Sequence, residues 1–171
     1  VNGFFKHERN ELPQQPSQDE LDRIRELALI FLYRLLFILK AEAQNLLPML
    51  DERGARTRYA EYASTAAIFK AVQAIDESDR SATQNAFRML QDLFALIDKG
   101  GQYDVPAYNG GLFDREKHAE LDTLWLHDDV VYHLLRTLIY LGDDKTPVRY
   151  ADLDVRDFGD IYEGLLGKRL V

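Results

Sequence analysis

The side chains that could do chemistry are few, and their spacing matches no catalytic or metal-binding motif. The chain has no cysteine, which excludes thiolate metal sites and disulfides. The four histidines show neither helical pairing nor the spacing of zinc ligands, so we interpret them as structural. They are His7, His118, His127 and His133. The chain also has no phosphate-binding loop and no Gly-x-Ser-x-Gly elbow, so its motifs indicate neither nucleotide binding nor hydrolase chemistry.

One acidic cluster contains the residue types that metal-dependent nucleases use. Such enzymes need carboxylates and a lysine that converge from strands, whereas the spacing here fits the solvated face of a helix. The residues are Asp114, Glu116, Lys117, Glu120 and Asp122. We therefore rank a small nuclease or hydrolase only third among our hypotheses. It predicts metal-dependent DNA cleavage by this chain alone.

Residues 104–114 are the only stretch that is typical of neither a helix nor an ordinary connector. Pro106 fixes its own φ and favours an extended conformation at the residue before it. Asn109, Gly110 and Gly111 are residue types that tolerate positive φ, so we expect the backbone to reverse sharply there. Helical patterns precede and follow this loop, which makes it the centre of the sequence.

The loop has two interpretations. In the first it is a packed plug, in which Tyr108, Leu112 and Phe113 fill a gap between helices. In the second, the exposed amides of the turn and Tyr108 contact a neighbouring domain or DNA phosphates. On the second interpretation the candidate interface residues are Tyr108, Asn109, Gly110, Gly111 and Phe113.

Further candidate contacts lie outside this loop. Basic residues that could touch DNA are Arg53, Arg56, Arg58, Lys168 and Arg169. The formal net charge of -8, from 21 basic and 29 acidic residues, favours the alternative that they are solvated helix ends. Tyr162 and Glu163 belong either to ordinary helix packing or to a hinge contact with another domain.

The apolar spacing predicts an all-α fold, an irregular bundle of about five or six helices with one long glycine-containing loop and little or no strand. The first helix begins after Ser17, which forms a capping-box pattern with Glu20. The predicted helices span about 18–45, 55–75, 81–99, a short segment within 115–126, 128–141 and 154–166. Ser81 and Gln84 repeat the capping pattern. Glycines 100, 101 and 142 close two of the helices, and 146–150 is expected to be extended.

Length and composition indicate one domain. The 171 residues, 46% of them hydrophobic, suffice for one core. We expect a mostly irregular N-terminal arm over 1–16, in which Phe4, Phe5 and Leu12 dock onto the body, and a single helical domain over 17–171. Because the chain starts at Val1 without a signal peptide, we expect it to be excised from a longer polypeptide. The longest apolar run, 28–39, is too short and too charged to span a membrane. The absence of cysteine is compatible with the cytoplasm.

Three stretches together carry a family resemblance. They are Tyr-Arg-Leu-Leu-Phe-Ile-Leu-Lys-Ala-Glu-Ala at 33–43, Val-Pro-Ala-Tyr-Asn-Gly-Gly-Leu-Phe-Asp at 105–114, and Tyr-Ala-Asp-Leu-Asp-Val at 150–155, leading to Phe-Gly-Asp-Ile-Tyr-Glu-Gly-Leu-Leu at 158–166. Their order and spacing resemble the helical region upstream of the methyltransferase domain in large adenine-specific DNA methyltransferases. That family includes single-chain type IIG restriction-modification enzymes and related phage-defence methylases. The match covers roughly residues 20–166.

The resemblance implies a role outside the chemistry. In that family the Tyr-Glu-Gly-Leu-Leu helix is usually followed by a domain that binds S-adenosylmethionine and holds the flipped adenine with an Asn-Pro-Pro-Tyr type motif. Neither occurs in this sequence, so no catalytic, cofactor-binding or metal residue is assigned here, and S-adenosylmethionine is expected in the parent's further domain. Family members often have Leu-Gly-Ser where this chain has Phe158, Gly159 and Asp160, which leaves the subfamily open.

Our first hypothesis is therefore a non-catalytic helical spacer of a restriction-modification type N6-adenine DNA methyltransferase. Its expected partners are the neighbouring methyltransferase domain, a nuclease domain where one exists, and DNA, with no membrane. The second hypothesis is a free-standing helical protein–protein interaction module that uses the 108–113 loop or the N-terminal arm. The coding sequence after Val171 distinguishes the two, through a methyltransferase motif series or a stop codon.

Overall fold

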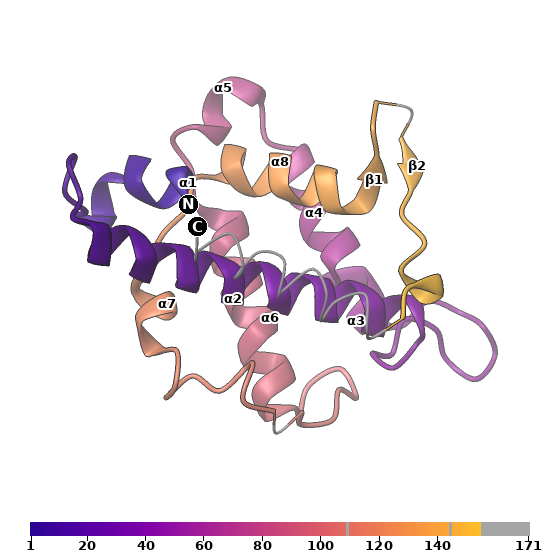
Figure 1. Ribbon diagram of the computed structural model, residues 1–171. Coiled ribbons are helices and arrows are strands. Elements are labelled where there is room, and N and C mark those ends of the chain that lie inside the picture. Colours follow the sequence, from indigo (N-terminus) through magenta and orange to yellow (C-terminus); the bar gives the residue numbers. More distant parts are fainter. Residues whose placement is uncertain (109, 144, 155–171) are drawn as a thin grey trace.

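A computed structural model describes residues 1–108, 110–143 and 145–154. Within these residues the fold is all-α apart from one two-stranded hairpin, which confirms the predicted irregular helical bundle (Figure 1). The elements are α1 Asn2–Lys6, η1 Glu8–Asn10, α2 Gln18–Ala43, α3 Arg58–Tyr62, α4 Thr65–Gln73, α5 Glu77–Arg80, α6 Asn85–Lys99, α7 Ala119–Thr123, α8 Asp128–Ile139, β1 Tyr140–Leu141, β2 Thr146–Pro147 and η2 Tyr150–Asp152. The helix predicted from about residue 154 to 166 lies, beyond its first residue, outside the described part.

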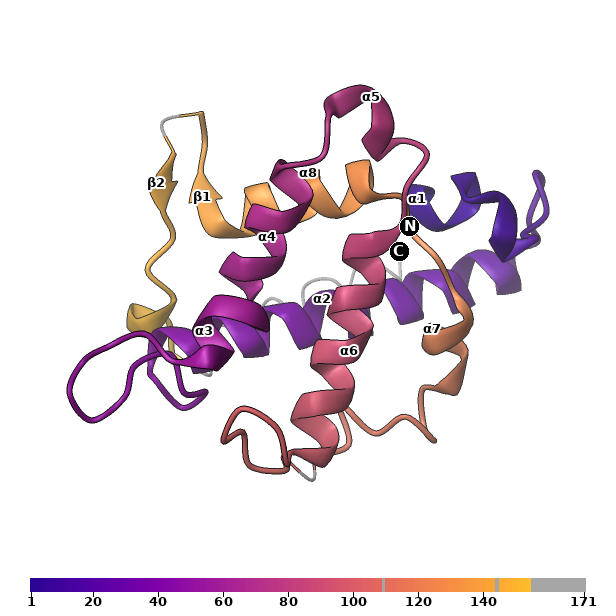
Figure 2. The same cartoon turned by 180° about the vertical axis from the view of Figure 1, so that it is seen from behind.

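Helix α2 is the element around which the others are arranged. It begins with the predicted capping box, in which the Ser17 hydroxyl accepts a hydrogen bond from the Glu20 amide and the Glu20 carboxylate accepts one from the Ser17 amide at 2.8 Å. Its 26 residues run across the molecule, and α6 crosses it steeply in two opposite views (Figures 1 and 2). Among the helices of the described residues, none is long and apolar enough to cross a membrane.

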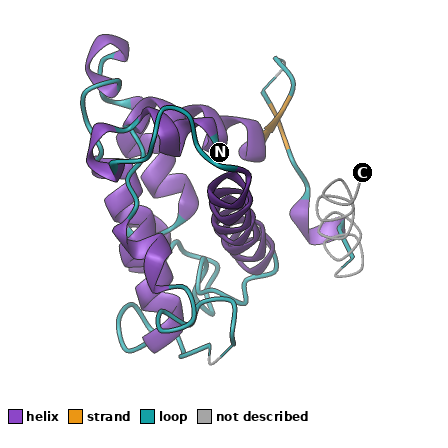
Figure 3. Ribbon diagram, turned by 60° about the vertical axis from the view of Figure 1, so that its left-hand side comes forward, coloured by secondary structure: helices purple, strands orange, loops and turns teal. Residues whose placement is uncertain are grey.

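The main core lies where α4, α6 and α8 pack on one another beside α2. Aromatic side chains from distant segments meet there. The Phe31 ring of α2 lies 5.6 Å from the Phe87 ring and 5.7 Å from the Phe94 ring of α6, and Phe4 of α1 packs edge-on against Phe31 and Phe87. Such edge-to-face pairs add to the free energy of burial. Figure 3 views α2 nearly end on, with the hairpin and η2 set apart from these helices.

The N-terminal segment differs from the irregular arm that we predicted. Residues 2–10 form α1 and η1, and Phe4 is fully packed in the core. Asn10 fixes this segment to the backbone of Trp125, because its side-chain amide donates to the Trp125 carbonyl at 2.9 Å and accepts from the Trp125 amide at 2.7 Å. The buried Phe4 ring and the Asn10–Trp125 contact, between residues 115 positions apart, therefore stabilise these helical turns. Local helix propensity does not predict them.

The single helix predicted over 55–75 is wrong, because the structure divides it into α3 and α4. Ser64 separates them, with its hydroxyl accepting from the Ala67 amide and donating to the Ala60 carbonyl at 2.7 Å. Ser64 therefore acts as the N-cap of α4, a position that serine favours over the helix interior.

The start predicted for the next helix is also wrong. Helix α6 begins at Asn85, and the Ser81 hydroxyl donates to the Ser78 carbonyl instead of capping it. Its first turn is capped from elsewhere, by the buried Asp128 carboxylate, which accepts from the Ala86 amide at 2.7 Å. An acidic group suits the positive end of a helix, but this one comes from α8 and no local pattern announces it.

The chain after α8 forms a hairpin. The helix ends at Ile139, before Gly142, which lies in the turn between β1 and β2 at a φ of 59° and so does not close the helix as predicted. Leu141 pairs with Thr146 in the antiparallel register. The extended conformation predicted for 146–150 holds for Thr146–Pro147, whereas Tyr150 begins η2.

Candidate functional site

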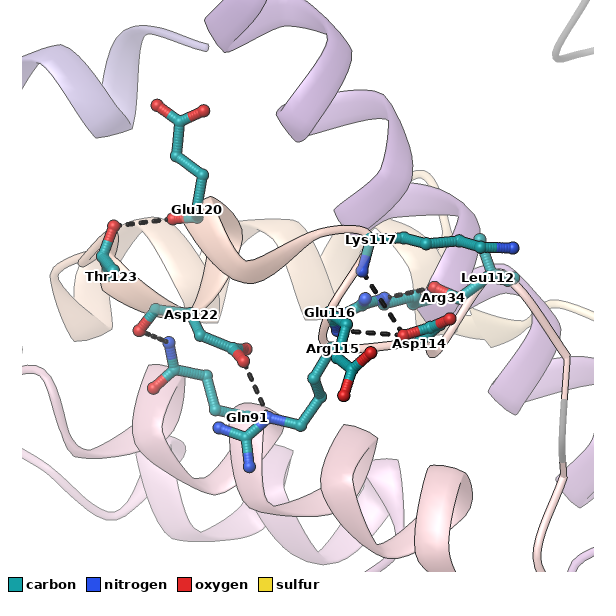
Figure 4. Close-up of polar contacts among 10 residues, drawn as sticks. All are labelled: Arg34, Gln91, Leu112, Asp114, Arg115, Glu116, Lys117, Glu120, Asp122 and Thr123. Atoms are coloured by element: carbon teal, nitrogen blue, oxygen red, sulfur yellow. Dashed lines mark hydrogen bonds and ion pairs between the residues drawn. The ribbon is translucent and has the colours of Figure 1, made fainter.

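The 105–114 loop is anchored to α2 by a buried arginine. Arg34 is 1% exposed, and its Nε donates to the Leu112 carbonyl at 2.8 Å (Figure 4). Its guanidinium lies 5.2 Å from the Phe94 ring centroid and 5.7 Å from that of Phe113. Burial lowers the pKa of Arg34, while the Asp122 and Asp98 carboxylates act in the opposite direction. One cation therefore joins α2, α6 and the loop through directed contacts.

The aromatic residues of the loop divide between core and surface. Phe113 is buried and packs edge-on against Phe37 at 5.4 Å. Tyr108 is half-buried, with its ring 5.9 Å from Phe37 and its hydroxyl donating to the Leu46 carbonyl at 2.9 Å. Phe37 is 38% exposed and Leu46 is 59% exposed. Phe37, Leu46 and Tyr108 thus form an exposed apolar area, which we call the Phe37 surface.

The loop turns within the predicted segment. The Gly110 amide donates to the Tyr108 carbonyl at 2.8 Å and the Phe113 amide donates to the Gly110 carbonyl at 3.2 Å, while Asn109 lies outside the described residues. Positive φ occurs before this turn, at Gly100, Gly101, Tyr103 and Asp104. A Cβ on Gly100 would lie 2.6 Å from the Ala107 nitrogen, so the returning loop requires glycine at the end of α6.

The third family-like stretch also rests on α2. The Lys40 ammonium donates to the carbonyls of Tyr150, at 3.3 Å, and Leu153. The Tyr150 hydroxyl donates to the Leu138 carbonyl at 2.6 Å, and its ring is buried in a small cluster with Leu36 and Leu39. Burial raises the pKa of Tyr150 to about 12. Stretches 33–43, 105–114 and 150–154 therefore meet on one helix.

Sequence reasoning missed Glu42, the buried carboxyl group at the end of this helix. Its Oε1 accepts from the Tyr59 hydroxyl at 2.8 Å and from the Thr65 amide at 2.9 Å, and its Oε2 accepts from the Thr65 hydroxyl. Burial raises the pKa of Glu42, although these hydrogen bonds act in the opposite direction. Glu42 thereby joins α2 to α3 and to the N-terminus of α4.

Of the candidate basic residues, Arg53, Arg56 and Arg58 lie in the described part of the chain. Arg56 and Arg58 border a surface depression of about 710 Å³ that Thr57 and residues 102–104 also line. The Arg56 guanidinium donates to the Ala60 carbonyl at 3.1 Å, and that of Arg58 lies 5.9 Å from the Tyr103 ring centroid. Arg53 is exposed in the preceding turn. Lys168 and Arg169, like Tyr162 and Glu163, lie outside the described residues.

The acidic cluster does not form a nuclease-like centre within the described part of the chain. Asp122 pairs with Arg115 at 2.7 Å, and the Asp114 carboxylate accepts from the Glu116 and Lys117 amides (Figure 4). Glu120 pairs with Arg23 of α2 at 3.1 Å. Asp114, Glu120 and Asp122 are thus engaged in separate contacts, and among the described residues the side chains of the cluster do not converge on a common point.

Two histidines do come together, contrary to our reading of the sequence. The imidazole rings of His7 and His127 stack with centroids 4.2 Å apart, and the Glu8 carboxylate lies 3.6 Å from His127 Nε2. Burial lowers the pKa of His7, and the electrostatic effect of the neighbouring His127 lowers it further. His7 and His127 are 120 positions apart, so no spacing rule for ligands within one element could have revealed the pair.

Comparisons of this chain with protein-family models, with curated proteins and with solved structures found no match.

Proposed function

We propose that this chain is the non-catalytic helical spacer of a restriction-modification type N6-adenine DNA methyltransferase, in which it positions neighbouring domains on DNA. The supporting observation is the joining of the three family-like stretches on α2. Arg34 links the first stretch to the second, and Lys40 links it to the third. Residues far apart in the sequence are thus joined by directed hydrogen bonds.

This arrangement suits a mount more than a catalyst. A spacer transmits position only if its elements keep a fixed geometry, and the buried polar contacts of Arg34 and Glu42 fix α2 against the loop and against α3 and α4. The Phe37 surface combines residues from the first two stretches with Leu46, and an exposed apolar area of this kind suits contact with a neighbouring domain.

The proposal assigns the chemistry and the cofactor to other parts of the parent protein. S-adenosylmethionine binds the expected methyltransferase domain, and an upstream nuclease, where present, cleaves DNA. The exposed Arg53, Arg56 and Arg58 offer contacts to DNA phosphates. We place the protein in the cytoplasm, because its proposed target, DNA, lies in that compartment.

The test uses the whole polypeptide that contains this chain. The purified parent is expected to transfer a labelled methyl group from S-adenosylmethionine to adenine N6 of duplex DNA, and residues 1–171 alone are expected to transfer none. A Lys40→Met variant loses the donor that holds Tyr150 and Leu153, so it should lower kcat while S-adenosylmethionine affinity stays unchanged. Lys70→Met, at an exposed position of α4, is the matched control. A parent without methyl transfer to adenine contradicts the proposal.

The Phe37 surface also fits a second candidate, a free-standing module that binds a protein partner. Phe37 and Leu46 are exposed in the chain as it stands, and Tyr108 supplies a polar group beside them. A coding frame that stops after Val171, together with a partner whose binding is lost on Phe37→Ser substitution, would favour this module over the spacer.

A further inference from the structure

The contact between the N-terminal segment and the turn before α8 brings three potential metal ligands together. A ring nitrogen of His7, a ring nitrogen of His127 and a carboxylate oxygen of Glu8 all lie within 4.8 Å of one another. His7 and Glu8 lie at the start of η1, and His127 is the residue immediately before α8. Asn10 holds these two segments together through both of its hydrogen bonds to the Trp125 backbone.

The polar atoms of this cluster are poorly satisfied by protein groups. His7 is 1% exposed, and its Nε2 has no hydrogen-bond partner among the described residues. On His127 the nitrogen that faces the Glu8 carboxylate is Nε2, at 3.6 Å. Buried polar atoms are normally hydrogen-bonded, so the orphaned Nε2 of His7, in a ring stacked on that of His127, needs a physical explanation.

We propose that His7, Glu8 and His127 form a binding site for Zn²⁺. Two imidazoles and one carboxylate are a ligand set that Zn²⁺ accepts, with water completing a four-coordinate shell. Glu8 has a side chain 76% exposed, so an ion can enter from solvent. This site is independent of the proposed spacer function, because none of its ligands belongs to the three family-like stretches.

The geometry requires a small closure. Donors that each lie about 2.0–2.1 Å from a tetrahedral ion are about 3.4 Å apart. The side chains must therefore draw together from the 4.8 Å limit, by rotation of the exposed Glu8 and a shift of the His127 ring. His127 Nε2 and the Glu8 carboxylate, 3.6 Å apart, need the least movement.

Binding also moves one proton. At present His7 Nδ1 accepts from the Arg9 amide at 3.2 Å, so the proton of the neutral ring is on Nε2. When Zn²⁺ binds at Nε2, the ring proton occupies Nδ1, so the Arg9 amide must turn away from Nδ1 and donate to solvent. Arg9 lies at an exposed position. Because the histidines must be unprotonated at the bonding nitrogens, affinity falls as the pH is lowered.

The experiment titrates the metal-stripped 171-residue chain with Zn²⁺ and follows the fluorescence of Trp125, the only tryptophan, whose ring lies 6.3 Å from that of His7. Co²⁺ provides a second probe, since a four-coordinate site gives its own visible absorption. We expect saturable binding of one ion, a Zn²⁺-dependent rise in the thermal midpoint, a shift of the Arg9 amide resonance, and no competition by excess Mg²⁺.

Matched variants separate this site from binding elsewhere. Glu8→Gln, at an exposed position that leaves the fold intact, should weaken Zn²⁺ by more than about tenfold, the lower end for the loss of an outer-shell partner, and His127→Gln by more. His118→Gln, outside the cluster, should bind as wild type does. The proposal is overturned if wild type shows no saturable binding, if Mg²⁺ displaces Zn²⁺, or if Glu8→Gln and His127→Gln both keep wild-type affinity.

Discussion

Glu42 offers the sharpest test of how the helices are held together. Its carboxyl group is buried and accepts hydrogen bonds from Tyr59 and Thr65, and burial raises its pKa above the ordinary value of 4.5. In the folded protein Glu42 therefore keeps its proton at pH values where the unfolded chain has lost it. The free energy of unfolding that this group contributes is fully present below about pH 4.5 and is lost as the pH rises through the folded pKa.

The size of the effect follows from the same contacts. Within that pH window, each pH unit lowers the free energy of unfolding by about 1.4 kcal/mol. Glu42→Gln keeps an acceptor for the Tyr59 hydroxyl and the Thr65 amide but cannot ionise, so its stability should not show this fall. Glu42→Ala removes the acceptor of three buried donors, the Tyr59 hydroxyl and the Thr65 amide and hydroxyl, at about 1–3 kcal/mol each, and should lose roughly 3–9 kcal/mol.

The assay is urea denaturation, followed by far-ultraviolet circular dichroism, at a series of pH values from 4 to 8. Subtracting the Glu42→Gln curve from the wild-type curve removes the titration of every other group. We expect the difference to shift in favour of Glu42→Gln as the pH rises above about 4.5. Parallel curves for the two proteins over this range, or a Glu42→Ala protein as stable as wild type, would refute the reasoning.

Two further pairs of substitutions test the loop and the α6 cap by the same denaturation assay. Gly100→Ala should lower the free energy of unfolding by at least about 2 kcal/mol, since a Cβ there meets the loop backbone at a positive φ. Gly101→Ala meets no atom within 4 Å and should cost only the backbone strain of about 1–2 kcal/mol. Equal losses of stability in the two variants would contradict the tight return of the loop. Asp128→Ala removes the buried cap of α6 and should cost about 0.5–2 kcal/mol. Asp129→Ala, at an exposed ion pair with His133, should change stability by less than about 1 kcal/mol, and a larger loss there than at residue 128 would show that the cap is misassigned.

The sequence predicted those parts of the fold whose signals are local. The Ser17–Glu20 capping box and the apolar pattern of α2 identified the central helix. Each of these signals is carried by residues that are only three or four positions apart in the sequence. Ser64 shows the limit of that reasoning. It lies in a helical pattern, yet its hydroxyl caps α4. At the same helix start the Thr65 amide donates to Glu42, 23 positions earlier in the chain.

The candidate site was predictable to a similar extent. The 105–114 stretch was recognisable from its proline and glycines, but the positive φ angles lie before it, at Gly100, Gly101, Tyr103 and Asp104. The loop returns there against the end of α6, where the Gly100 backbone meets that of Ala107. His7 and His127 each look unremarkable in sequence, and only the tertiary fold stacks their rings. Contacts of this kind depend on packing between distant segments, which spacing rules do not describe.

The measurement that tests the central claim most directly is the translated coding frame beyond Val171. A spacer of an adenine-specific methyltransferase predicts that the frame continues into a domain with an S-adenosylmethionine pocket and an Asn-Pro-Pro-Tyr type motif. A stop codon at that point, or continuation into a domain without these motifs, would contradict the account.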